Sequence, residues 1–109
     1  MLRIIKSKVD DKALKEAAED FDGYIKVVVD VQRQILAAGG KKHVAGESLL
    51  LRDGSKQADL WGGGLDLETG EVDFDSMINL RPAQSNSSRE VLDKNIREKV
   101  EAVIRKLLK

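Results

Sequence analysis

A run of β-branched residues at 24–31, YIKVVVDV, constrains the fold more than any other part of the sequence. Branched side chains suit the pleated surface of a strand and lose rotamer freedom in a helix, so the run predicts a β-strand. Alternate side chains of a strand point to opposite faces. One face is wholly apolar, with Ile25, Val27, Val29 and Val31, and the other is half polar, with Tyr24, Lys26, Val28 and Asp30. This pattern predicts a sheet that helices cover on its apolar side.

Two amphipathic helices are predicted to supply that cover, one near each end of the chain. Residues 10–21 carry apolar side chains at helical spacing after Asp10, which is a suitable N-cap. A second helix is predicted to begin near Asp93 and to end in basic residues, which the helix dipole favours. Its apolar stripe comprises Ile96, Val100, Val103, Ile104, Leu107 and Leu108. Each helix therefore has one apolar face to present to the sheet.

Further strands are predicted at residues 2–5, 34–38 and 47–52, and residues 60–67 and 71–80 form a predicted hairpin around a turn at 68–70. The links between strands are short, which favours antiparallel neighbours. We therefore predict an α+β fold, in which an antiparallel, meander-like sheet of four or five strands carries the N- and C-terminal helices on one face. The predicted core comprises Ile25, Val27, Val29, Val72, Phe74, Ile78, Ile96, Val100, Val103 and Leu107. The opposite, partly polar face is left for function.

Composition limits the functions that the chain can have. Its 109 residues suit a single domain over residues 1–109. Nineteen basic and 19 acidic residues balance, which argues against non-specific nucleic-acid binding. The absence of cysteine excludes a disulfide scaffold, a cysteine nucleophile and a thiolate zinc site. No signal-peptide pattern and no apolar run of membrane-spanning length occur, so a cytoplasmic, soluble protein without a membrane partner is expected.

The spacing of His43 and Glu47 raises the question of a metal site. Residues four apart lie on the same side of a helix, but in a strand they are ~13 Å apart and cannot share one ion. The two side chains would converge only if residues 44–46 turn, with Asp30 as a third ligand. The alternative is that His43 is a loop histidine with ordinary hydrogen bonds.

Two further features suggest a ligand site. Trp61, the only tryptophan, precedes three glycines, which mark a bulge or a close approach of the backbone. It is interpreted either as a core anchor or as a platform for a ligand. Arg81 could clamp a carboxylate or phosphate, or its polar segment could simply bond its own loop. The glycines lack the spacing of a dinucleotide-binding fingerprint, and no cofactor is predicted.

Several motifs resemble a family of short prokaryotic proteins known only as a domain of unknown function. The resemblance covers most of the chain and rests on VDVQR at 29–33, GGKKHVAGE at 39–47, DGSKQADLWG at 53–62 and INLRP at 78–82. It implies no established activity. The family's polar motif positions fall on Asp30, Arg33, His43, Glu47, Gln57, Asp59, Trp61, Asn79 and Arg81.

Three functions from different classes follow. The first is a non-catalytic binding or adaptor domain for a small polar ligand or a protein partner, the second a metal-assisted hydrolase built on Asp30, His43 and Glu47. The third is a structural subunit that buries its sheet face in a homo-oligomer. We expect the stretches 39–47, 57–61 and 79–86 to meet on one rim, where His43, Trp61 and Arg81 would line a single pocket for a small anionic or polar ligand.

Overall fold

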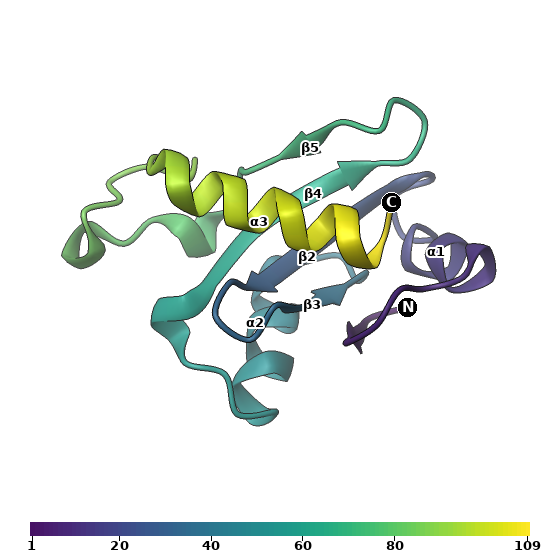
Figure 1. Cartoon of the computed structure of the whole chain (residues 1–109), viewed down its shortest axis with the longest axis horizontal. Coiled ribbons are helices and arrows are strands. Elements are labelled where there is room, and N and C mark those ends of the chain that lie inside the picture. Colours follow the sequence, from purple (N-terminus) through teal and green to yellow (C-terminus); the bar gives the residue numbers. More distant parts are fainter.

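A five-stranded antiparallel sheet forms the centre of the computed structural model, which describes all 109 residues (Figure 1). The strands are β1 (Arg3–Ile5), β2 (Tyr24–Asp30), β3 (Ile35–Ala38), β4 (Leu60–Asp66) and β5 (Val72–Asp73), and the helices are α1 (Asp11–Ala17), α2 (His43–Arg52) and α3 (Lys94–Leu107). The strand order is β1-β3-β2-β4-β5, so β2 lies between β3 and β4 rather than beside β1. The predicted α+β class, with an antiparallel sheet and helices near both ends, is confirmed.

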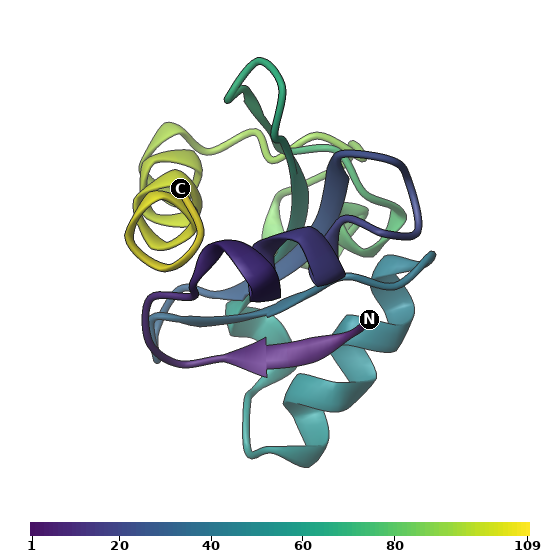
Figure 2. The same cartoon turned by 90° about the vertical axis from the view of Figure 1, so that its right-hand side faces the viewer.

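The terminal helices α1 and α3 pack on one face of the sheet, as the alternation in β2 predicts (Figure 2). Asp10 and Asp93 are their N-caps, and each carboxylate accepts backbone N–H hydrogen bonds of the first turn. The larger core lies beneath them and includes Ile25, Val27 and Val29 of β2. Seven of the ten predicted core residues are buried there, while Val72 and Ile96 pack against it half-buried. The seven are Ile25, Val27, Val29, Phe74, Val100, Val103 and Leu107.

Helix α2 covers the other face of the sheet, which corrects the prediction of a strand at 47–52. Leu50 is fully buried against Val28 and Leu60 in a second, smaller core. A Cβ on Gly46 would lie 3.1 Å from Val28 Cγ2, so glycine at this position lets the helix approach the sheet closely. Helices therefore pack on both faces of the sheet, so neither face is left entirely bare for a homo-oligomer to bury.

The predicted second arm of the hairpin, residues 71–80, is a strand only at Val72–Asp73, and the rest of that prediction is wrong. After β5 the chain turns through a short 3-10 helix at Met77–Asn79. The side-chain amide of Asn79 takes the place of a strand partner: it accepts a hydrogen bond from Gly62 N–H (2.8 Å) and donates to the Gly62 carbonyl (2.9 Å). Ile78, which we predicted in the larger core, packs against the smaller one. No helix of the structure is long and apolar enough to cross a membrane.

Candidate functional site

An open groove of about 540 Å³ lies on the α2 side of the sheet. One wall is the start of α2, with Lys42, His43 and Val44, and the floor includes Tyr24 and Lys26 of β2. The opposite wall comes from Asp73, residues 75–78, Arg89 and Glu90. We call this space the groove. Its volume falls in the range of small-molecule sites, about 300–1,000 Å³.

His43 is the first residue of α2, and its ring is fixed by the sheet. The Nε2 atom lies 2.7 Å from the backbone carbonyl oxygen of Gly63. Because a carbonyl only accepts, Nε2 carries the proton, and the neutral ring leaves Nδ1 as a hydrogen-bond acceptor. Burial lowers the pKa of His43, and Lys26 also lowers it, while the bond to Gly63 and the carboxylates of Asp73 and Asp75 oppose the shift. The neutral form is therefore favoured.

The N-terminus of α2 is basic and has no cap. Lys42 is the N-cap residue in extended conformation, and no side chain accepts a hydrogen bond from the first turn. That turn also lacks an acidic residue, so no side chain of the turn itself offsets the positive end of the helix dipole. N–H groups without a side-chain partner and the ammonium of Lys42 thus lie at a helix end that favours anions.

The groove floor is held by a bond between β2 and β5. The Tyr24 hydroxyl donates to Asp73 Oδ2 at 2.6 Å, across the backbone of Gly64. Burial raises the pKa of Tyr24, and the hydrogen bond to Asp73 raises it further, so Tyr24 stays protonated. The second carboxylate oxygen of Asp73, Oδ1, accepts a hydrogen bond from the backbone N–H of Asp75 at 3.2 Å.

The three glycines at 62–64 allow a close approach, as predicted, but the atoms that approach belong to the protein itself. A Cβ on Gly62 would collide with Ser76, one on Gly63 with the backbone carbonyl of Asp73, and one on Gly64 with the Tyr24 hydroxyl. The glycine run is therefore a packing requirement of the β4 edge.

Arg81 lies at the start of β4, away from the groove. Its guanidinium donates to the backbone carbonyls of Gln57 (2.7 Å) and Leu60 and stacks on Trp61, with Cζ 3.9 Å from the ring centroid. Burial lowers the pKa of Arg81, and the neighbouring carboxylate of Glu47 opposes this. All these contacts are internal, so the structure supports the alternative in which Arg81 binds its own chain.

Two buried asparagines hold the loop that follows β5. Beyond Gly62, the Asn79 amide donates to the carbonyls of Phe74 and Arg89, both at 3.0 Å. The Asn86 amide donates to the carbonyls of Asn79, Ser88 and Glu90 and accepts from the N–H of Leu92. We call Trp61, Asn79, Arg81 and Asn86 together the Arg81 corner. Gln57 and Asp59 lie beside it, with Gln57 exposed and Asp59 half-buried.

Asp30 and Arg33 belong to a third polar cluster, at the turn between β2 and β3. The fully buried Asp30 carboxylate accepts from the N–H groups of Gln32 and Arg33 and from the Ser55 hydroxyl. Arg33 in turn donates to Ser55 Oγ and to Asp53, both at 2.7 Å. The guanidinium of Arg33 and the ammonium of Lys6 lower the pKa of Asp53. This cluster ties two turns to the end of β1.

The metal site that the spacing of His43 and Glu47 raised as an alternative is not assembled by the structure. Helix α2 does place His43 and Glu47 on one side, four residues apart, but Asp30 is already bonded at the β2–β3 turn. Nowhere in the structure do three His, Cys, Asp or Glu residues gather so that they could hold a metal ion. Glu47 is instead buried near Arg81, with its Oε2 atom unpartnered.

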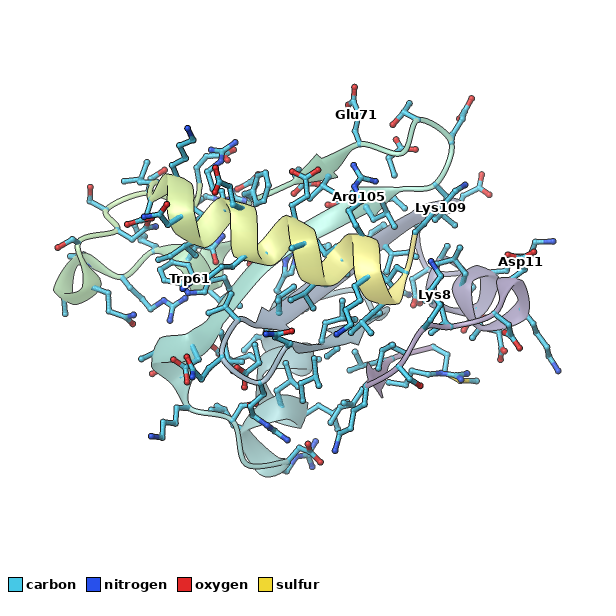
Figure 3. The ribbon with its side chains drawn as sticks, in the orientation of Figure 1. Lys8, Asp11, Trp61, Glu71, Arg105 and Lys109 are labelled. Atoms are coloured by element: carbon cyan, nitrogen blue, oxygen red, sulfur yellow. The ribbon has the colours of Figure 1, made fainter.

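The expectation that His43, Trp61 and Arg81 line one pocket is also wrong. Val28 pairs with Gly62 and Val29 with Trp61, so Gly62 and Trp61 face opposite sides of β4. His43 lies on the Gly62 side, its Cδ2 being 3.2 Å from where a Cβ would stand, whereas Trp61 is buried in the core near α3 (Figure 3). Of the three, only Trp61 and Arg81 meet.

Of the twelve residues that line the groove, only His43 was in the predicted site; the residues missed include Tyr24, Lys26, Lys42, Asp73, Asp75 and Glu90. A signal for four of them was present, because Tyr24 and Lys26 share the half-polar face of β2, and Asp73 and Asp75 share one face of the following arm. Antiparallel neighbours bring such polar faces together. Lys42 lies in the stretch 39–47 that we expected at the site, but nothing singled it out, since its position depends on α2, whose second half we predicted as a strand.

Comparisons with known proteins give a family and no activity. A family model described as "Protein of unknown function (DUF5674)" matches residues 3–107, and the chain therefore belongs to that family. No curated protein and no solved structure matches the chain.

Proposed function

We propose that this member of the DUF5674 family is a non-catalytic binding protein whose groove holds a small polar ligand, with an anionic group of the ligand at the N-terminus of α2. One observation carries the proposal: the uncapped, basic start of α2 forms a wall of the groove. Helix N-termini bind carboxylates and phosphates through free N–H groups and the helix dipole.

The charged side chains on this wall support the same role. Lys26 and Lys42 line the groove, and neither forms an ion pair with a carboxylate of the chain. The ammonium of Lys26 lies 5.1 Å from the ring centroid of Phe21, a contact that leaves its positive charge available. His43, held in place by Gly63, offers Nδ1 to a hydrogen-bond donor of the ligand.

Chemical-shift mapping on the 15N-labelled protein tests the proposal, with acetate and inorganic phosphate as separate probes. Both anions should shift the backbone amides of residues 42–45, which form the start of α2. Lys42→Ala should weaken these shifts, whereas Lys41→Ala, an exposed neighbour outside the groove, should change them little. Shifts scattered over the whole surface, or equal in both variants, would overturn the proposal.

A further inference from the structure

The charge on the far wall of the groove, the wall opposite α2, narrows the class of ligand. This inference rests on the proposed binding function. Asp73, Asp75 and Glu90 line this wall together with a single cation, Arg89. Arg89 Nε pairs with Asp75 Oδ1 at 3.1 Å, and Glu90 forms no ion pair. Three carboxylates facing one guanidinium leave this wall with an excess of negative charge.

The opposite charges do not neutralise each other across the groove. Lys26 of β2 pairs in register with Gly64, and Gly64 pairs with Asp73, so one strand separates the lysine from the carboxylate. The Tyr24 hydroxyl occupies the space above Gly64 and takes Asp73 Oδ2. The neutral Tyr24 hydroxyl therefore makes the bond to Asp73 that the ammonium of Lys26 could otherwise make. The groove keeps one basic wall and one acidic wall.

Apolar side chains flank both walls at the surface. Val44 on the α2 wall is 53% exposed and Met77 on the far wall 62% exposed, among the most exposed large apolar residues of the chain. Ile78 lies beside Met77, half-buried. A ligand that reached both charged walls would therefore also contact apolar surface, and burying it would add to affinity.

We propose that the ligand is a small zwitterion of amino-acid chemistry with an apolar side chain, either a free amino acid or a dipeptide. Its carboxylate binds at Lys42 and the start of α2, and its ammonium binds at Asp73 and Glu90 on the far wall. The apolar side chain lies between Val44 and Met77.

Calorimetry with four related probes tests the assignment: L-leucine, L-leucyl-L-leucine, N-acetyl-L-leucine, which lacks the ammonium, and L-leucinamide, which lacks the carboxylate. At least one of the two zwitterions should bind about tenfold more tightly than either blocked probe, corresponding to about 1.4 kcal/mol. Comparing leucine with the dipeptide distinguishes the two sources of the same chemistry.

Matched variants assign each charge to its wall. Glu90→Gln should weaken binding of the zwitterion but leave N-acetyl-L-leucine unaffected, and Lys42→Ala should weaken both. Glu98→Gln, an exposed residue of α3 outside the groove, is the control. Thermal melting of each variant checks that the fold is intact.

The possible failures are distinguishable. If N-acetyl-L-leucine binds as tightly as the zwitterions and shifts the amides of 42–45, the groove binds anions, so the binding function stands and the zwitterion is wrong. If L-leucinamide binds as tightly as the zwitterions while N-acetyl-L-leucine does not, the assignment of the ligand's carboxylate to the start of α2 is wrong. If none of the four leucine-derived probes binds at millimolar concentration while acetate and phosphate still do, only the zwitterion proposal is overturned. If acetate and phosphate also fail to bind, both proposals are overturned.

Discussion

The Arg81 corner and the groove both gather polar side chains, and they differ in how those side chains are bonded. In the corner, the side-chain amides of Asn79 and Asn86 each have four backbone groups within hydrogen-bonding distance. In the groove, Lys26 and Lys42 have no carboxylate partner. A buried polar group without a partner costs stability, so the corner residues are needed by the fold. The two groove lysines are not buried, so this cost does not apply to them.

The largest effect is expected in the corner, for Asn79→Ala. The change leaves the N–H and carbonyl of Gly62 without their partner in the protein interior. It also removes one of two donors from the carbonyls of Phe74 and Arg89, which still accept from the N–H groups of Val91 and Ser76. We expect a loss of about 4 kcal/mol in the free energy of unfolding, measured by urea denaturation. Asn95→Ala, on an exposed face of α3, is the matched control and should be nearly neutral. Equal midpoints for the two variants would show that the corner is not a structural clamp.

Gly63→Ala tests whether the glycine run serves packing or ligand access. The new methyl group would overlap the backbone carbonyl of Asp73, which cannot move without breaking the β4–β5 contact. The expected loss is about 3 kcal/mol.

Gly46→Ala provides a graded comparison for that result. Its methyl group would stand 3.1 Å from Val28 Cγ2, a side-chain atom that can shift, and alanine favours the helix by about 1 kcal/mol over glycine. Its loss in thermal stability should therefore be clearly smaller. The opposite ranking would contradict the packing role of Gly63.

The fold could be predicted from the sequence only where a local pattern has a single structural meaning. The alternation in residues 24–30 predicted β2 and its apolar face, because a two-residue period has one structural meaning. Residues 47–52 were misassigned because three consecutive leucines fit a buried strand or a helix equally well. The choice depends on contacts such as that between Gly46 and Val28, which only the folded chain supplies.

The site was harder to predict than the fold for a related reason. Asn79, Arg81 and Asp30 stood out as polar residues in motifs, and all three bond backbone or side chains up to 25 residues away. Such long-range bonds leave no periodic trace in the sequence. The groove, in contrast, depends on the half-polar faces of two strands, a weaker pattern that pairing in the sheet makes meaningful.

Lys42→Asp should stabilise the protein and abolish ligand binding. Aspartate at the N-cap position would accept a hydrogen bond from the first turn of α2, which lacks one, and would complement the helix dipole. We expect a gain of about 1 kcal/mol in chemical denaturation. The same charge reversal should remove the shifts that acetate produces at residues 42–45. A variant that is less stable than the wild type, or that still binds acetate, would mean that this helix end is not held open for a ligand.

The smallest effect is expected from acid titration of His43, and it is confined to a narrow pH range. Burial lowers the pKa of His43 below its ordinary value of about 6.5, so in that range the unfolded chain binds a proton that the folded protein resists. The contribution to stability is complete above about pH 6.5 and is lost as the pH falls toward the lowered pKa. Because His43 is the only histidine, its ring resonances in a proton NMR titration report this group alone.

His43→Gln keeps a donor for the Gly63 carbonyl and does not titrate, so the stability of this variant should fall less between neutral and mildly acidic pH. Asn79 and Asn86 carry no titratable group and the guanidinium of Arg81 stays charged at mildly acidic pH, so the Arg81 corner should contribute nothing to this slope. An unchanged slope in His43→Gln, or a ring that titrates at its ordinary pKa, would place His43 among the solvent-exposed side chains and remove the reason to treat Nδ1 as a fixed acceptor in the groove.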